Sequence, residues 1–208
     1  MSQPCESNCN VPQPGDVDEE LNEFWVGSPW KIFQENNLSA FERNRLFINA
    51  GDRRFLDISY VTSTDSDGDG RSSLAADFNN DGRLDLAVRQ AGGGPLLVYE
   101  NRFAKQNFLK VTLRGRESNR LGVGCRLIAT AAGREIVREC SPTNSYLSQA
   151  PLVIHFGIGN ATQVDRLLVK WPSGQQTKLT GLPINRHLIV TEGADQFVTA
   201  QPGVTVSP

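Results

Sequence analysis

Short stretches in which apolar and polar residues alternate recur along most of this 208-residue chain. A period of two is typical of β-strands that bury one face, and turns rich in glycine, proline and aspartate separate the stretches. The pattern predicts a first set of strands at residues 45–49, 55–61, 72–78, 84–89 and 96–100. A second set is predicted at residues 108–114, 124–130, 135–140, 152–158, 164–171, 176–180 and 187–191. The fold class is therefore predicted to be all-β.

The two strand sets are predicted to form separate domains, because a polar segment at residues 104–106 lies between them. One short helix is expected over residues 17–25, where Asp16 would cap the N-terminus and acidic residues occupy the first turn. After Gly193 no further strand is predicted. The expected organisation is a tail with a short helix (1–39), a first β-module (40–104), a second β-domain (105–193) and a C-terminal tail (194–208).

The charge balance is close to neutral, with 21 lysines and arginines against 23 aspartates and glutamates. Such a composition predicts no strong attraction to nucleic acid or to an anionic membrane. No apolar run approaches the length of about 18 residues that a membrane-spanning helix needs. The first residues lack the charged and apolar regions of a signal peptide, so an exported form is expected to begin downstream of a removed leader.

The most informative motif lies at residues 77–85, where oxygen-bearing side chains occupy loop positions 1, 3, 5 and 9 and Gly82 occupies position 6. Calcium takes about six to eight oxygen ligands, and a glycine allows the backbone to turn sharply around the ion. An EF-hand would need a glutamate at position 12, where Val88 stands. We therefore predict a calcium site on a loop that leads into a strand, the alternative being a solvated polar turn. The predicted ligands are the side chains of Asp77, Asn79, Asp81 and Asp85 and the backbone carbonyl of Arg83.

A second acidic run just upstream contains Asp65, Asp67 and Asp69. It begins like the first motif but carries Ser73 at position 9 and Ala76 at position 12. Three closely spaced carboxylates repel one another unless a cation or solvent relieves the repulsion. A second or shared calcium ion and a flexible acidic turn are both compatible with this run.

The chain has four cysteines. Cys125 and Cys140 flank a segment that is predicted to form a hairpin turning at residues 132–133, a register that places the two cysteines opposite each other. A disulfide between them is expected because cross-strand neighbours lie within bonding reach, and two buried thiols are the alternative. Cys5 and Cys9 lie in a polar tail and have no second pair at ligand spacing, which argues against zinc.

Common catalytic signatures are absent from the sequence: there is no nucleophile elbow, P-loop, dinucleotide-binding glycine motif or zinc-protease helix. His155 lies in an alternating strand and is interpreted as a structural residue. Aromatic side chains beside a calcium loop can bind sugars, so a calcium-dependent carbohydrate-binding module is an alternative function. The aromatic residues concerned are Trp25, Trp30, Tyr146 and Trp171, although core or turn packing is the preferred interpretation of Trp171.

Two groups of residues resemble known families. Residues 44–49, 51–52, 55–58, 69–71 and 77–85 resemble the blade repeat of FG-GAP/VCBS propellers. Residues 108–192 resemble the ASPIC/UnbV domain of the cartilage acidic protein family, through pieces at residues 113–115, 118–120, 122–124, 146–149, 155–157, 164–165 and 171–174. The resemblance implies a single propeller-blade-like β-module followed by an antiparallel β-sandwich or barrel-like domain. It also implies a mostly extracytoplasmic or secreted protein that binds Ca²⁺ and has no established catalytic chemistry.

A closed propeller needs about four to eight blades, whereas residues 44–103 supply roughly one. A lone blade leaves sheet edges and apolar faces that must be covered. The second domain, another copy, or the rest of a larger parent protein would provide that cover. We expect a non-catalytic structural, adhesion or self-assembly module that associates with itself or with a protein partner. An enzyme accessory domain is the less favoured function.

Overall fold

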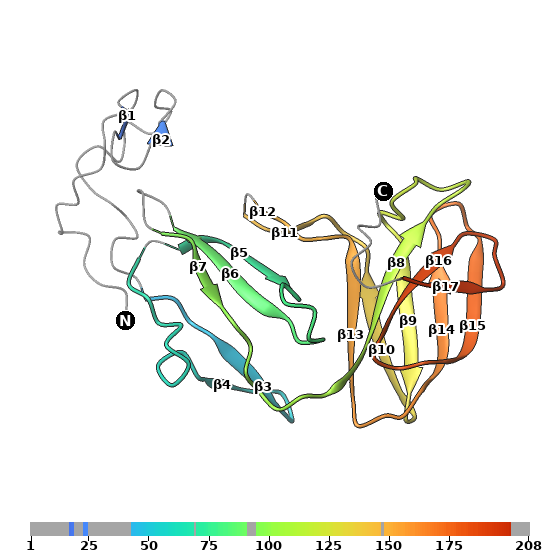
Figure 1. Cartoon of the computed structure of the whole chain (residues 1–208), viewed down its shortest axis with the longest axis horizontal. Coiled ribbons are helices and arrows are strands. Elements are labelled where there is room, and N and C mark those ends of the chain that lie inside the picture. Colours follow the sequence, from blue (N-terminus) through green and yellow to red (C-terminus); the bar gives the residue numbers. More distant parts are fainter. Residues whose placement is uncertain are drawn as a thin grey trace. The chain divides into compact units, whose positions relative to one another are not determined.

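The computed structural model describes residues 43–68, 70–90, 95–146 and 148–200, together with two short strands near the N-terminus (Figure 1). The described residues form strands and turns, which confirms the all-β class. They contain no helix that could cross a membrane. The chain divides into two compact units, one built from Met1–Ser73 and Leu86–Tyr99 and the other from Leu74–Asp85 and Glu100–Pro208. This division differs from the predicted boundary near residues 104–106, because the 77–85 loop groups with the second unit.

The N-terminal helix predicted over residues 17–25 is wrong. Strand β1 (Val17–Asp18) pairs antiparallel with β2 (Glu23–Phe24), and Val17 lies opposite Phe24. A helix shorter than about 12 residues is marginal in water even with a good cap. Valine and phenylalanine favour strands, so the pairing prevails over the local capping signal.

The first unit contains a hairpin and most of a three-stranded sheet (Figure 1). The hairpin pairs β3 (Phe47–Gly51) with β4 (Arg54–Asp57). The sheet has the order β5 (Gly70–Ala76), β6 (Asp85–Gln90) and β7 (Leu97–Tyr99). Every strand of the first predicted set is therefore confirmed, with shifted ends.

The second unit is a sandwich of two four-stranded sheets, which confirms the sandwich and excludes the barrel-like alternative for the described residues (Figure 1). One sheet has the order β13 (Val153–Gly159), β8 (Asn107–Arg114), β16 (Arg186–Thr191) and β17 (Phe197–Thr199). The other has the order β10 (Arg134–Glu139), β9 (Arg126–Ala131), β14 (Val164–Lys170) and β15 (Gln176–Leu182). A short pair joins β11 (Thr143–Ser145) and β12 (Ser148–Gln149).

Two features of the sandwich differ from the predictions. Strand β8 pairs with β16 in parallel, so the domain is not purely antiparallel. Strand β17 lies in the segment expected to be a tail and pairs with β16. Phe197 packs against the core, and this apolar contact, together with the backbone bonds at the edge of β16, explains why the chain remains ordered there.

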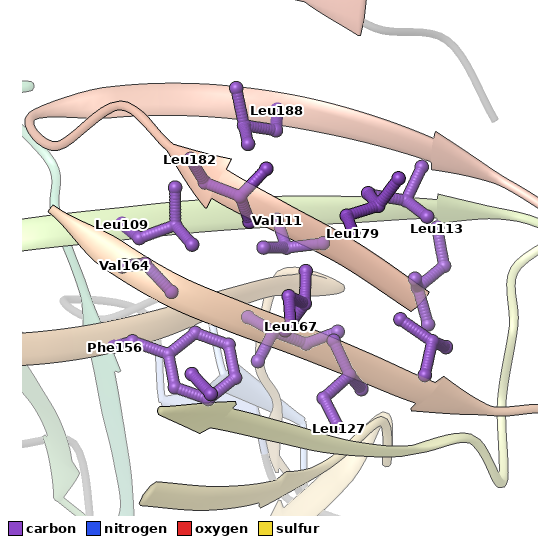
Figure 2. Packing of buried hydrophobic residues seen from close by; sticks show 14 of the residues in the cluster. Leu109, Val111, Leu113, Leu127, Phe156, Val164, Leu167, Leu179, Leu182 and Leu188 are labelled. Carbon is purple, nitrogen blue, oxygen red and sulfur yellow. The ribbon is translucent and has the colours of Figure 1, made fainter. Parts of the chain in front are cut away.

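The core of the second unit lies between the two sheets (Figure 2). Alternate residues of β8 and β13 point inward and meet the inward residues of β9 and β14. The fully buried aliphatic and aromatic side chains include Leu109, Val111, Leu127, Phe156, Leu167 and Leu188. Burying a side chain of this size contributes about 1.5–3 kcal/mol, so this core supplies most of the second unit's stability.

The hairpin of β9 and β10 has the predicted register: Arg126 pairs with Glu139, and the turn residues Ala132 and Gly133 both have positive φ. The predicted disulfide is not present, because Cys125 and Cys140 are both free and buried thiols. Burial raises the pKa of Cys125 to about 12, and it also raises the pKa of Cys140. The thiolate form that forms disulfides is therefore disfavoured at both positions. Cys5 and Cys9 lie outside the described residues.

Glu192 is a buried charge that ties two loops of the second unit together. Its Oε2 atom accepts hydrogen bonds from three consecutive backbone N–H groups, at residues 116 to 118, at 2.7 to 2.9 Å. Its Oε1 atom accepts from the hydroxyls of Ser118 (2.7 Å) and Ser173 (2.6 Å). Burial would raise the pKa of this carboxyl group, but the bonds from Ser173 and Ser118 outweigh that effect and lower the pKa to about 2.

Glu192→Gln should lower the free energy of unfolding at pH 7 by about 3 kcal/mol, because an amide cannot accept from all of these donors. The pKa of Glu192 is depressed in the folded state, so its contribution is fully present above the ordinary pKa of 4.5 and is lost as the pH falls toward about 2. The difference between wild type and variant, measured by urea denaturation, should shrink over that interval. Glu139→Gln, at an exposed position, is the control. A difference that stays constant with pH would contradict this assignment.

Candidate functional site

The 77–85 loop is folded by hydrogen bonds from its own backbone to its first aspartate. Asp77 Oδ1 accepts from the Asp81 N–H and Asp77 Oδ2 accepts from the Gly82 N–H, each at 3.0 Å. The chain turns through positive φ at Asn80 (60°) and at Gly82 (92°). A glycine adopts this conformation without a steric penalty, so the sequence pattern indicated the turn correctly.

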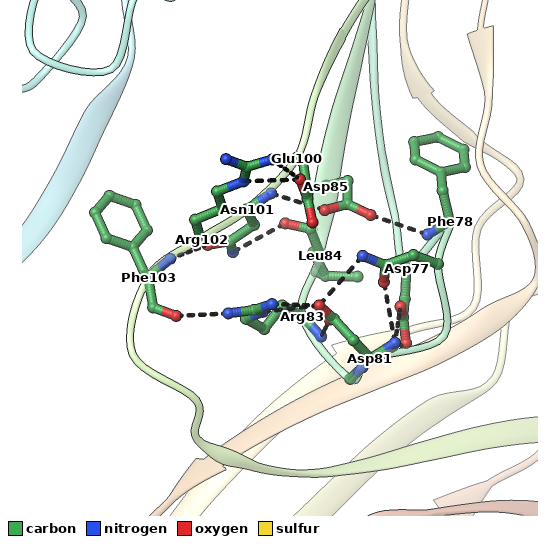
Figure 3. Close-up of polar contacts among 12 residues, drawn as sticks. Asp77, Phe78, Asp81, Arg83, Leu84, Asp85, Glu100, Asn101, Arg102 and Phe103 are labelled. Carbon is green, nitrogen blue, oxygen red and sulfur yellow. Dashed lines mark hydrogen bonds and ion pairs between the residues drawn. The ribbon is translucent and has the colours of Figure 1, made fainter.

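Asp85 links the start of the loop to the segment that follows β7 (Figure 3). The residue is 2% exposed. Its Oδ2 atom accepts from the Phe78 N–H at 3.1 Å, and its Oδ1 atom accepts from the Asn101 N–H at 2.8 Å. The side chain of Asn101 also donates to the Leu84 carbonyl at 3.0 Å. Both ends of the loop are therefore held by a buried carboxylate.

Arg83 neutralises the middle carboxylate of the loop (Figure 3). Its guanidinium contacts Asp81 Oδ2 through Nη2 and through Nε, the latter at 3.0 Å. Its Nη1 atom donates to the Phe103 carbonyl at 2.9 Å. The side-chain hydrogen bond from Arg83, joined by one from its backbone, lowers the pKa of Asp81 to about 2. Asp81 is thus ionised at neutral pH and already has a positive partner.

The loop is docked on the outer face of the sheet that contains β8. Lys110 Nζ lies 2.5 Å from Asp77 Oδ2 and 3.4 Å from Asn80 Oδ1. His155 Nε2 donates to the Gly82 carbonyl at 2.8 Å. Phe108 also points outward, yet it is only 8% exposed, and a side chain at Gly82 would meet its ring at 2.1 Å. The loop therefore covers a face of β8 that would otherwise be open.

A small cavity of about 120 Å³ remains between the loop and this sheet face. Its lining includes Asp77, Lys110, His155 and His187. Burial lowers the pKa of His155, and the hydrogen bond to Gly82 partly offsets the change. Burial, reinforced by the charge of Lys110, lowers the pKa of His187, whose Nε2 lies 2.8 Å from the Thr112 hydroxyl. The two imidazoles are thus held as neutral, hydrogen-bonded groups at pH 7.

The donor types of the loop suit calcium, because carboxylate and amide oxygens are its preferred ligands. The side chains of Asn79 and Asp81 lie in contact at 3.2 Å. The charges around the loop compete with a cation, since Lys110 binds Asp77 and Arg83 binds Asp81. Within the described part of the chain, no three acidic, histidine or cysteine side chains converge as a metal cluster. The donor types suit the ion, while both oxygens of Asp77 and of Asp85 accept backbone hydrogen bonds and two positive groups already contact the loop.

Among the residues that the structure describes, the other candidates do not form a cluster. In the second acidic run, Asp65 forms an ion pair with Arg43 at 3.0 Å, and Asp69 lies outside the described residues. Of the four aromatic residues considered for sugar binding, Trp171 is 4% exposed and donates to Thr177 at 2.9 Å, which confirms its packing role. Tyr146 is 62% exposed. Trp25 and Trp30 lie outside the described residues.

Sequence reasoning missed the residues that receive the loop. Phe108, Lys110 and His155 occupy outward positions of β8 and β13, and Lys110 and His155 are register partners. Polar residues at outward positions normally face solvent. The large aromatic side chain of Phe108 on this outward face was the one signal in the sequence that another segment covers the face.

The protein is thus all-β. Its second unit is a sandwich domain, and a polar, acidic loop is docked on the outer face of one of the two sheets. Comparison with known proteins identifies both parts. Residues 33–88 match the FG-GAP-like repeat, and residues 115–197 match the family described as ASPIC and UnbV. The chain therefore matches an FG-GAP-like repeat and then an ASPIC and UnbV domain, in the order that the sequence resemblance had indicated.

Two curated relatives are similar to most of the chain. Cartilage acidic protein 1 of Mus musculus and of Homo sapiens are each 26% identical to it over 164 residues, which is 77% of this chain. The chain spans 24% of the length of each relative. The similarity therefore concerns a segment of these longer proteins.

Gly82→Ala should weaken the docking of the loop, because the added Cβ would lie 2.1 Å from the Phe108 ring at a φ of 92°. Gly174→Ala is the matched control, since Gly174 has a φ of 91° and no atom within 4 Å of the added Cβ. Both variants should lose about 1 kcal/mol from the backbone conformation, and Gly82→Ala should lose about 1–3 kcal/mol more from the clash.

Urea denaturation measures both losses, and hydrogen exchange at residues 77–85 should rise in Gly82→Ala alone. Equal losses in the two variants would show that the Phe108 contact does not hold the loop.

Proposed function

We propose that residues 77–85 bind a calcium ion that has a structural role in a non-catalytic, extracytoplasmic module. The observation that supports this proposal is the burial of the carboxylates at the two ends of the loop. The side chain of Asp77 is 4% exposed and Asp85 is 2% exposed. Buried carboxylates require hydrogen bonds, an opposite charge or a metal ion. The match of residues 33–88 to the FG-GAP-like repeat supports the same assignment.

The ion would be held by Asp77, Asn79, Asp81 and Asp85, with the Arg83 carbonyl as a further ligand. Its contribution would be to stabilise the folded loop, because the unfolded chain has no preformed site. The residues of the chain supply the rest: Asp85 ties the loop to Asn101, and His155 holds the Gly82 carbonyl against the sheet. The similarity to cartilage acidic protein 1 supports an extracytoplasmic location.

Calcium should raise the melting temperature relative to EDTA. At a free calcium concentration 100 times the dissociation constant, the expected gain in the free energy of unfolding is about 2.7 kcal/mol. Asp81→Asn should remove most of that gain by deleting a charged ligand. Asp165→Asn, a change of the same kind on an exposed residue of β14, should leave it unchanged.

Differential scanning fluorimetry and isothermal titration calorimetry measure these effects. An unchanged wild-type melting temperature together with a flat calorimetric titration would refute calcium binding.

A second function, self-association, is favoured by the apolar surface of the β3–β4 hairpin. Phe47 is 55% exposed, Phe55 62% and Leu56 56%. The hairpin forms a two-stranded sheet with open edges, and such edges accept further strands. Two copies present the same apolar side chains and the same edges to each other, and the near-neutral net charge of −2 opposes their approach only weakly. We therefore propose a second copy of the chain as the occupant of this surface.

Phe55→Glu should shift the protein toward the monomer, because a charge cannot be buried in an apolar contact between copies without a large penalty. Val137→Glu is the control, since Val137 is an exposed apolar residue of the other unit. Size-exclusion chromatography with light scattering at micromolar concentration should give a mass above that of one chain for wild type and control. A monomeric mass for the wild type would rule out self-association under these conditions.

A further inference from the structure

We propose that Lys110 competes with calcium for Asp77. The 77–85 loop then stays docked on β8 without the ion, and the ion binds only by displacing the ammonium group. This inference rests on the proposed calcium binding. It assigns to Lys110, a residue of strand β8 that lies between the two family matches, the control of a site in the FG-GAP-like repeat.

The geometry places the Lys110 ammonium group where a cation would be needed. Its Nζ atom lies 2.5 Å from Asp77 Oδ2 and 3.4 Å from Asn80 Oδ1. It also lies 5.6 Å from the centroid of the Phe108 ring, which places the positive charge near the π-system. The ammonium group therefore contacts the first ligand of the predicted calcium loop.

Burial makes this ion pair more costly to break than one at the surface. The side chain of Lys110 is 12% exposed and that of Asp77 is 4% exposed. Removing one member of such a pair leaves an uncompensated charge in a site from which water is largely excluded, and this is strongly destabilising. The pair thus holds the loop against β8 when no calcium is bound.

Calcium and the ammonium group cannot both use Asp77 freely. One oxygen of Asp77 accepts from the Asp81 N–H, and the other accepts from the Gly82 N–H and from Lys110. A divalent ion bound to the same carboxylate would repel the ammonium group at close range, where screening by water is weak. Binding of the ion therefore requires Lys110 to withdraw.

Arg83 opposes the binding of calcium less than Lys110 does. It contacts Asp81, and the side chains of both residues are 25% exposed. The guanidinium can move into solvent while keeping its charge hydrated, whereas Lys110 projects from the middle of β8 between its register partners His155 and His187. Lys110 is therefore the residue that sets the affinity of the loop for calcium.

Lys110→Met tests the proposal, because it removes the ammonium group and keeps a long apolar side chain. The variant should bind calcium about tenfold more tightly than the wild type in isothermal titration calorimetry, a change that corresponds to about 1.4 kcal/mol. Its melting temperature in EDTA should be lower than that of the wild type, since Asp77 loses its counter-charge. Lys178→Met, at an exposed position of β15, should change neither quantity.

The outcomes separate this inference from the proposed function. Tighter binding by Lys110→Met, or binding by that variant alone, supports the competition. Equal affinity in variant and wild type overturns the competition and leaves calcium binding in place. Absence of binding in both proteins at millimolar calcium overturns the proposed function, and the competition with it.

A measurement on the wild type covers the case in which Lys110→Met does not fold. In the presence of EDTA, NMR spectra of the lysine ammonium groups should contain one signal protected from exchange with water. That signal should disappear as calcium is added. A protected signal that persists at saturating calcium would overturn the displacement of Lys110.

Discussion

Strand β8 buries both of its faces, and this constraint organises the second unit. Leu109 and Val111 point inward and pack in the core between the two sheets. Phe108 and Lys110 point outward, where the hydrogen-bonded loop at residues 77–85 covers them. A central strand with polar outward residues would ordinarily face water. Here the outward face needs an apolar contact for Phe108 and a counter-charge for Lys110, and the loop supplies both.

Buried charges fix the loops of this protein more than apolar contacts do. The carboxylate of Glu192 accepts hydrogen bonds from three consecutive backbone N–H groups and from two hydroxyls. The carboxylate of Asp85 accepts a hydrogen bond from the Asn101 N–H and so joins the 77–85 loop to Asn101. An unsatisfied buried charge costs far more than a typical surface ion pair gains. Alternative loop conformations that would break these bonds are therefore disfavoured. The same argument applies to Lys110 and Asp77.

The strands and the β9–β10 hairpin could be predicted because their signals are local: alternation of residue types, and a turn at Ala132 and Gly133. The loop turn could be predicted for the same reason. The docking of the loop could not, because Lys110 lies 33 residues after Asp77 and the alternation of β8 shows only that Lys110 points outward. Glu192 was missed for a similar reason, since its partners at residues 116–118 lie 74 to 76 residues away and Ser173 lies 19 residues away. Short edge strands such as β17 depend on a partner strand and carry little local signal of their own.

The borders of the two family matches differ from the borders of the compact units. The FG-GAP-like match ends at residue 88 and the ASPIC and UnbV match begins at residue 115, yet Leu74–Asp85 groups with Glu100–Pro208. A loop that lies within the FG-GAP-like match thus packs on the sheet that contains β8, which lies between the two matches. Separating the 77–85 loop from β8, which lies between the two matches, would leave Phe108 without cover and would leave Lys110 and Asp77 as unpaired charges. The physical unit is the sandwich together with its docked loop, and a positive charge beside Asp77 holds the loop in place. In the structure that charge is the ammonium group of Lys110.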